Sequence, residues 1–288
     1  MDDWDGVPQH EEVLREDGEL ILSASSVGTY LRCPKQWEFA YIHKERRPPT
    51  IKQALGIASH EAYDKDMTAK LATGENWPLS LVEDAFSTDY DAKWREGFSI
   101  LKENEEDPGA AKDQQIRVIR KYSLDLAPLI EPVMVEQSFI IEVDGILYSG
   151  TLDLASIDRL FVNPETIRET IKVRDWKNTA QKPSDTSKYV FGMIGYALGF
   201  RAITGTVEDE VQLDYLVRYK KQEPGYFPVS SGGPVGPRAI EGFATTLRDV
   251  RDSIMKGSFF PAGLQNGACS WCGYREICPA YAAARLAS

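Results

Sequence analysis

Cysteine and histidine are scarce in this chain, and several sequence signals are missing altogether. Its 288 residues include four cysteines and three histidines. No stretch approaches the roughly 18 consecutive apolar residues of a membrane-spanning helix. The acidic N-terminus has no apolar run of the kind found in signal peptides. We therefore expect a cytoplasmic protein with no membrane partner, in a reducing compartment where cysteines are metal ligands or core residues rather than disulfides.

Positive charge is also in short supply. The chain has 44 Asp and Glu against 33 Lys and Arg, a formal net charge of −11. Eight of the acids and one arginine lie within residues 1–19, so we interpret residues 1–20 as an acidic, flexible tail. The remaining residues carry 36 acidic and 32 basic side chains, and such a nearly neutral body can bind DNA through a local basic groove.

The hydrophobic pattern changes twice along the rest of the chain. Residues 21–130 show helical spacing, with Ser23, Ser25 or Ser26 able to cap a first helix and a second helix expected from Ile51 through Leu71. Residues 131–225 contain runs of alternating polarity that predict strands, and residues 226–288 contain an amphipathic helix followed by a cysteine-rich segment. We expect one domain over 21–288, of the mixed α/β class.

Within residues 131–225, local signals predict the order of the elements. Asp144-Gly145 predicts a tight hairpin turn between two strands. SKYVFGMIGYALGFRAI is apolar almost all round and predicts a buried helix packed on the sheet, while RLFVNPETIRE predicts an extended turn and EPGYFPVSSGGPVGP a loop.

Two carboxylates and a lysine stand out in the predicted strands. Asp153 lies in GTLDLA, and Asp175 and Lys177 form DWK. Side chains alternate along a strand, so Asp175 and Lys177 share a face, and Asp153 joins them if the strands are neighbours. Paired carboxylates suit Mg²⁺ or Mn²⁺, and a nearby lysine can orient an attacking water. The alternative is a surface Asp–Lys ion pair.

His60, in LGIASHEAYDK, is a candidate metal ligand on the second predicted helix. Tyr63 and Asp64 share its face at three and four residues' distance. A structural or exposed role is the alternative for a single helix histidine. Glu136, in VEQSF, is a further candidate carboxylate.

Three of the four cysteines cluster in CSWCGYREICP, as Cys269, Cys272 and Cys278, whereas Cys33 lies far upstream. Four thiolates can hold either a [4Fe–4S] cluster or Zn²⁺, and the spacing does not decide between them. A metal bound by all four would join the N-terminal and C-terminal segments. Alternatively, Cys33 is a core residue unrelated to the others.

Taken together, these motifs resemble those of the RecB-like nucleases of the PD-(D/E)XK superfamily. The similarity is to members with a four-cysteine iron–sulfur cluster, such as AddB-type helicase-nucleases, CRISPR-adaptation exonucleases and phage relatives. It rests on segments that follow one another in the family's order: SASSVGTYLRCPKQWEFAY, GIASH, SGTLDLASID, VRDWKN and C-x-x-C-x-x-x-x-x-C.

The resemblance implies a restriction-endonuclease-like central sheet flanked by helices and a metal-dependent DNA exonuclease acting on ends or single strands. Recombination, repair or DNA processing is the implied setting, with a helicase, annealing or recombination protein as partner. The implied catalytic residues are Asp153, Asp175 and Lys177. The implied ligands of Mg²⁺ or Mn²⁺ are His60, Asp153, Asp175 and the Trp176 carbonyl. The implied [4Fe–4S] ligands are Cys33, Cys269, Cys272 and Cys278. Candidate DNA contacts are Tyr196, Lys188, Arg46 and Arg47.

One position departs from the family pattern. Where relatives often have Gln-x-x-x-Tyr after the lysine, Gly192 precedes Tyr196, and Lys188 one turn earlier is a candidate substitute. This departure and the acidic charge favour an alternative function, a non-catalytic iron–sulfur module of the same fold that binds or assembles on DNA. The intact Asp153, Asp175 and Lys177 favour the nuclease.

Overall fold

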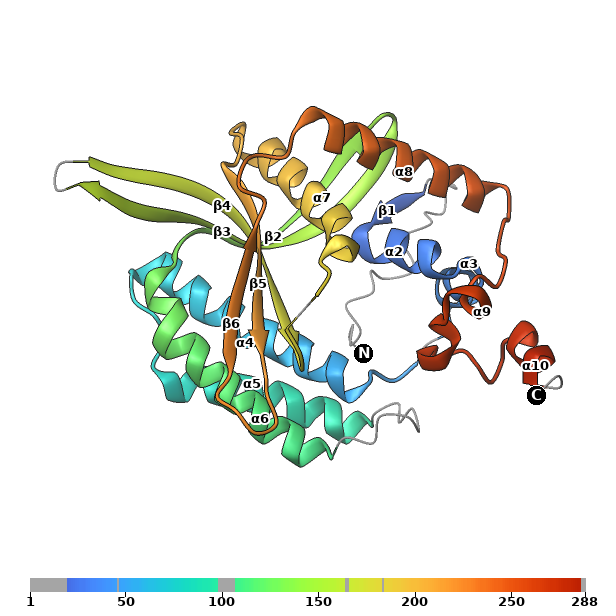
Figure 1. The fold of residues 1–288 in the computed structure, drawn as a ribbon, viewed down its shortest axis with the longest axis horizontal. Helices are drawn as coiled ribbons and strands as arrows, with labels where there is room; N and C mark the ends of the chain where they lie inside the picture. The colour runs from blue at the N-terminus through green and yellow to red at the C-terminus, as the bar shows by residue number, and fades with distance from the viewer. Residues whose placement is uncertain (1–19, 46, 98–106, 164–165, 183, 286–288) are drawn as a thin grey trace.

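A mixed β-sheet lies between two layers of helices in the computed structural model (Figure 1). The structure describes residues 20–45, 47–97, 107–163, 166–182 and 184–285. The expected tail, residues 1–20, falls outside these ranges except for its last residue. The architecture confirms the predicted mixed α/β class with a restriction-endonuclease-like sheet flanked by helices.

The described residues form a six-stranded sheet in the order β1-β3-β4-β5-β6, with β2 paired to β3. The β1–β3 and β4–β5 pairs are parallel and the other pairs are antiparallel. The strands are β1 (Ile21–Ser23), β2 (Glu131–Val143), β3 (Ile146–Asn163), β4 (Thr166–Thr179), β5 (Glu210–Val217) and β6 (Gly225–Ser230).

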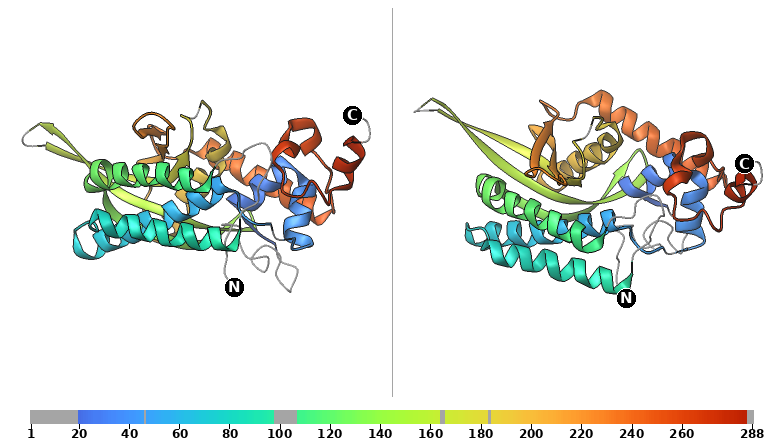
Figure 2. Two further views of the ribbon diagram at one scale, coloured as in Figure 1. Left: turned by 90° about the horizontal axis from the view of Figure 1, so that it is seen from below. Right: turned by 60° about the horizontal axis from the view of Figure 1, so that its bottom comes forward.

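Helices cover both faces of the sheet (Figure 2). One layer consists of α4 (Ile51–Thr73), α5 (Leu79–Glu96) and α6 (Pro108–Lys121). The other face carries α7 (Ser187–Thr204) and α8 (Pro237–Met255). Shorter helices lie beyond the edge of the sheet: α2 (Ala24–Arg32), α3 (Pro34–Trp37), α9 (Gly263–Asn266) and α10 (Pro279–Arg285). No helix among the described residues is both long and apolar enough to cross a membrane.

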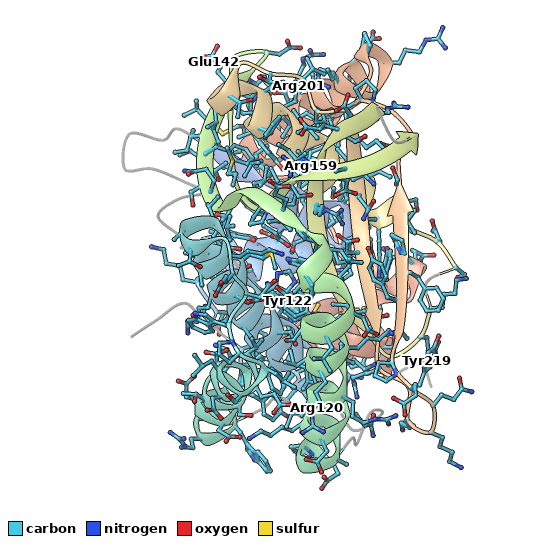
Figure 3. All side chains as sticks on the ribbon, turned by 90° about the vertical axis from the view of Figure 1, so that its left-hand side faces the viewer. Arg120, Tyr122, Glu142, Arg159, Arg201 and Tyr219 are labelled. Carbon is cyan, nitrogen blue, oxygen red and sulfur yellow. The ribbon has the colours of Figure 1, made fainter. Side chains whose placement is uncertain are left out.

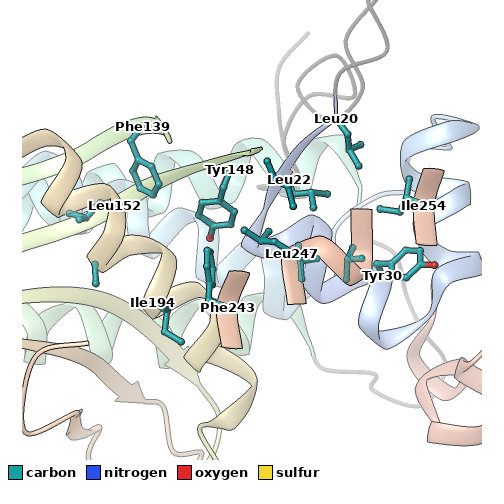
Figure 4. Close-up of a cluster of buried hydrophobic side chains, with 14 of the residues drawn as sticks. Leu20, Leu22, Tyr30, Phe139, Tyr148, Leu152, Ile194, Phe243, Leu247 and Ile254 are labelled. Carbon is teal, nitrogen blue, oxygen red and sulfur yellow. The ribbon is translucent and has the colours of Figure 1, made fainter. Parts of the chain in front are cut away.

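The core that joins the sheet to α7 and α8 is built from aromatic and branched side chains (Figure 4). The helix α7 approaches the strands closely because it carries glycines at the contacts. A Cβ on Gly195 would lie 2.3 Å from the Tyr148 hydroxyl, and one on Gly199 would lie 2.5 Å from the Phe139 ring. This close packing buries most of the middle of α7, between Met193 and Phe200, against the sheet as predicted, whereas Val190 and Ile203 near its ends are exposed.

Two predictions for the connecting segments are wrong. The segment RLFVNPETIRE is not an extended turn, because β3 continues to Asn163 and β4 begins at Thr166, forming a two-stranded arm that projects from the body (Figure 1). Arg159 on the arm (labelled in Figure 3) bonds to Glu131 and to Glu169 across the strands. Likewise, part of the Gly/Pro-rich segment forms edge strand β6, where a proline is tolerated.

The N-terminal and C-terminal segments pack against each other around α3. The Trp37 ring stacks on Phe259 with centroids 5.7 Å apart. The Tyr30 hydroxyl donates to the Ser258 carbonyl at 2.6 Å, and the Asn266 amide donates to the Arg32 carbonyl at 2.7 Å. Residues more than 200 positions apart in the sequence are thereby held together.

Candidate active site

Strands β3 and β4 place the two predicted metal aspartates side by side. Leu154 pairs with Arg174 in antiparallel register, so Asp153 and Asp175 face each other across the strands. Both are buried, at 7% and 4% exposure. Lys177, two residues along β4, places its ammonium nitrogen 2.6 Å from the Asp175 carboxylate. The arrangement is a partly buried ion pair with a second carboxylate beside it.

His60 reaches this pair from α4. The capping box of Thr50 and Gln53 begins that helix, and His60 lies in its third turn. The His60 Nε2 atom lies 2.8 Å from the Trp176 carbonyl oxygen, and Nδ1 lies 3.3 Å from Asp153 Oδ2. One imidazole thus contacts both a backbone oxygen and a carboxylate of the predicted ligand set.

The protonation state of His60 makes this geometry informative. Burial, together with the nearby Lys177 ammonium, lowers the pKa of His60 to about 4, so the ring is neutral at pH 7. A neutral imidazole carries one N–H, and therefore one ring nitrogen presents a lone pair to an oxygen. A cation near these atoms would relieve that repulsion, so the donor set fits a divalent metal.

Burial also sets the charges of the acid–lysine group. Desolvation raises the pKa of Asp175 to about 7 and, although Lys177 opposes this, the neighbouring Asp153 adds to it. Desolvation likewise raises the pKa of Asp153. For Lys177, desolvation lowers the pKa but the two carboxylates more than offset it, and the net pKa is raised. The lysine therefore stays charged, whereas burial opposes ionisation of both acids.

Two further carboxylates border the site. Burial raises the pKa of Asp64, and repulsion from Glu136 and Asp153 raises it further. The Asp64 Oδ1 atom is buried with no hydrogen-bond partner among the described residues. Glu136 has a φ of 46°, a left-handed conformation that is strained for a glutamate and common at functional sites. Sequence reasoning had Glu136 as a candidate but gave Asp64 no role, although its position four residues after His60 was the available signal.

The Trp176 side chain is fully buried on the opposite face of β4. Its ring packs 5.4 Å from Tyr63 and 5.5 Å from Tyr122, whose place in the helical layer is labelled in Figure 3. The Trp176 ring thus belongs to the core, whereas its backbone faces the candidate site. The carbonyl oxygen contacts His60, and the N–H donates to Asp153 Oδ2 at 3.1 Å.

The four cysteines come together at the other end of the molecule. Cys33 ends α2 and is buried, and a Cβ built on Gly263 would lie 3.6 Å from its sulfur and 3.1 Å from that of Cys269. Burial raises the pKa of Cys272, and the other three thiols raise it further. Within the described residues, no set of three or more His, Cys, Asp or Glu side chains is already arranged as a metal-binding group, here or at the carboxylates.

The candidate DNA-binding residues lie in different places. Tyr196 is half-buried, and burial raises the pKa of its hydroxyl, as do Asp153 and Asp175 nearby. The Lys188 ammonium lies 4.8 Å from the Tyr189 ring centre, and Lys177 lies 4.9 Å from the same ring.

The remaining candidate DNA contacts are remote from this ring or not described. Arg47 lies over Tyr274 in the cysteine segment, and Arg46 falls outside the described residues. A Cβ built on Gly192 would lie 3.4 Å from the Ala24 Cβ of α2, an ordinary van der Waals contact, so this position lies against that helix.

Comparison with known proteins adds two findings. The family model described as the PD-(D/E)XK nuclease superfamily matches residues 21–279. A crystal structure described as a "Putative exonuclease" from Eubacterium rectale has a similar fold, with a TM-score of 0.52 and 10% sequence identity over 89% of this chain and 86% of that one. No curated protein matches the chain.

Proposed function

Because the chain belongs to the PD-(D/E)XK nuclease superfamily, we propose that it is a metal-dependent DNA exonuclease that hydrolyses phosphodiester bonds. The observation that carries the proposal is the meeting of Asp153, Asp175 and Lys177 on neighbouring strands beside His60. The similarity to the Eubacterium rectale protein, described as a "Putative exonuclease", favours attack from DNA ends. One domain over residues 21–288, with recombination, repair or DNA processing as its setting, completes the proposal.

Nucleases of this superfamily usually use Mg²⁺ or Mn²⁺. Here Asp153, Asp175, the His60 imidazole and the Trp176 carbonyl would hold the ion, which when bound polarises the phosphate and lowers the pKa of a bound water. Two buried acids with raised pKa values and an unprotonated imidazole form a donor set with more lone pairs than protons. Such a set favours a hard or borderline divalent cation.

Lys177 has the geometry of a positioning and charge-balancing group. Its side chain is 22% exposed, so part of it reaches solvent while the ammonium is bonded to Asp175. A protonated lysine at this place orients an attacking water and offsets the negative charge that develops on the phosphate. We expect it to stay charged through the reaction, since both carboxylates raise its pKa.

Lysines and aromatic rings beside Lys177 offer a path for a DNA strand. Lys188 and Lys177 flank the Tyr189 ring, and Lys182 lies 4.6 Å from the centre of the Phe227 ring. Ammonium groups over rings bind the backbone of a single strand while the rings stack bases. A helicase, annealing or recombination protein remains the proposed partner, because the chain has no P-loop motif of its own.

We further propose that Cys33, Cys269, Cys272 and Cys278 hold a [4Fe–4S] cluster. Two observations support the fit: neighbouring thiols lie close enough to help raise the pKa values of Cys269 and Cys272, and Gly263 leaves open the space that a Cβ would take beside two of the sulfurs. Anaerobically purified protein should contain about four irons per chain. Cys33→Ala should lose iron as completely as Cys272→Ala, and stoichiometric zinc without iron would overturn the assignment.

The nuclease proposal is tested with end-labelled single-stranded and double-stranded DNA. Mn²⁺ or Mg²⁺ should support stepwise shortening from an end, and chelator should stop it. Lys177→Met should abolish cleavage, whereas the matched variant Lys172→Met, which removes another paired lysine of β4, should retain it. DNA binding by the wild-type protein without cleavage under any metal condition would instead identify the non-catalytic module.

A further inference from the structure

A buried polar network lies directly behind the candidate active site, where α4, α6 and β4 meet. The Gln115 side-chain amide on α6 donates to Ser59 Oγ on α4 at 2.9 Å and to Asn178 Oδ1 on β4 at 2.8 Å. The Tyr63 hydroxyl donates to the same Asn178 oxygen at 3.1 Å. Gln115 is 1% exposed, and Ser59 and Tyr63 are fully buried.

The network contributes little to the stability of this core, because two of its buried polar atoms lack partners within the part of the chain that the structure describes. Gln115 Oε1 and Asn178 Nδ2 are buried without hydrogen-bond partners among the described residues. An unpaired buried polar atom costs about 1–3 kcal/mol, whereas apolar replacements of the same shape can be neutral or stabilising. The surroundings, which include Trp176 and Tyr122, would accommodate an apolar side chain. Stability alone therefore does not explain why a glutamine amide is buried at position 115.

The positions of Ser59 and Asn178, the two hydrogen-bond partners of Gln115, indicate a structural role for its amide. Ser59 precedes His60 on α4, and Asn178 follows Lys177 on β4. Gln115 thus bridges the residue next to the candidate histidine ligand and the residue next to the candidate lysine. Two hydrogen bonds join the two elements directly, one from Tyr63 to Asn178 and one, at the candidate site itself, between His60 and Trp176. A ring nitrogen that coordinates a metal no longer donates to a carbonyl, so this bond cannot set the spacing in the loaded site.

We propose that Gln115 is a positioning residue, whose amide fixes α4 against the end of β4 and so holds His60 in register with Asp175 and Lys177. The proposal rests on the proposed nuclease function for its consequences, but the geometric role itself is independent of catalysis. Gln115 touches neither DNA nor metal in this assignment and acts through Ser59 and Asn178.

The test compares two buried glutamines changed to methionine, which has nearly the same shape. Gln115→Met should keep the wild-type melting temperature in chelator or raise it, yet weaken Mn²⁺ binding by about tenfold in calorimetry. The value of kcat should fall while KM for DNA stays unchanged. Gln212, 4% exposed and bonded to Asp214 on β5, provides the control: Gln212→Met should leave Mn²⁺ affinity intact.

A readout without metal separates this proposal from the nuclease proposal. In metal-free protein, the NMR signal of the His60 Nε2 proton should show a hydrogen bond to the Trp176 carbonyl that weakens in Gln115→Met. Asn178→Leu, which removes the other partner, should give the same change, and the double variant should add little. An unchanged His60 signal and Mn²⁺ affinity in either folded variant would overturn the positioning role. If the wild type neither binds Mn²⁺ nor cleaves DNA but the His60 signal still responds, the nuclease proposal fails and the positioning role stands.

Discussion

Metal binding at the carboxylate site should release a proton, and the pH dependence of that release can be worked out from the structure. Burial raises the pKa of Asp175 from 3.8 to about 7. That shift of about three units corresponds to ~4 kcal/mol against ionisation in the metal-free protein. Because a metal requires the ionised carboxylate, the proton has to leave before binding. The apparent Kd for Mn²⁺ should therefore rise about tenfold for each pH unit below 7.

The raised pKa of Asp175 also makes the stability of the metal-free protein depend on pH. Metal affinity increases as the pH rises, whereas this stability decreases. Between the unfolded pKa of 3.8 and the folded pKa of about 7, the native chain holds a proton that the unfolded chain has lost. The contribution of Asp175 to the metal-free protein therefore falls as pH rises through this window. The pKa of His60 is lowered to about 4, so its contribution to stability rises with pH instead. Above pH 5 His60 is already neutral, and it releases no proton when a metal binds.

Calorimetric titration of Mn²⁺ in buffers of different ionisation enthalpy measures the proton directly. We expect about one proton released per ion at pH 6 and close to none at pH 8.5. Asp175→Asn should remove the pH dependence together with most of the affinity. Asp158→Asn is the control, because Arg174 and Lys172 keep the pKa of that carboxyl below its usual value despite partial burial. A constant affinity from pH 5.5 to 7.5 would refute the reasoning, since Asp175 would then be ionised without a metal.

Three other substitutions test separate parts of the structure. Gly263→Ala should lose iron, because its Cβ would lie 3.1 Å from the Cys269 sulfur. The control Gly233→Ala, which has open space around it, should keep its iron, and the iron content of both variants is measured. Gly195→Ala should lower the unfolding free energy by about 1–3 kcal/mol in denaturant titration, because its Cβ would overlap a buried tyrosine. His60→Ala should weaken Mn²⁺ more than Mg²⁺, since imidazole favours the transition metal; equal loss for both ions would remove it as a ligand.

Local signals in the sequence predicted the elements that carry the candidate site. The Asp144-Gly145 turn forms with φ values of 50° and 73°, as a tight hairpin requires. The second helix was expected from Ile51 through Leu71 and extends from Ile51 to Thr73, ending at a glycine in the left-handed conformation. These features depend on residues close in sequence, and so a single chain suffices to predict them.

The features that were missed depend on residues far apart. The strand β6 forms because its backbone hydrogen-bonds to β5, from the Gln212–Ser230 pair to the Val217–Gly225 pair. The Gly/Pro-rich composition of the segment, taken alone, predicts a loop instead of a strand. Asp64 joins the carboxylates only because α4 packs its face toward β2 and β3, bringing it to Glu136 and Asp153. Its spacing of four residues from His60 places Asp64 on the same helix face, but this spacing does not show that the face is packed against the sheet.

The two candidate metal centres depend on different contacts of the same sheet. The segment that carries Cys33 is anchored through β1, which pairs with Leu147–Ser149 of β3, four residues before Asp153. The helix that carries His60 is anchored on the other side, through Gln115 and Asn178. If the cysteines bind a metal, its loss should therefore loosen the β1 end of strand β3, while the bridge from α4 to β4 remains. The ring stack of Trp37 on Phe259 should also remain, because it involves no thiol, so the segments that carry these two rings should stay together without a metal.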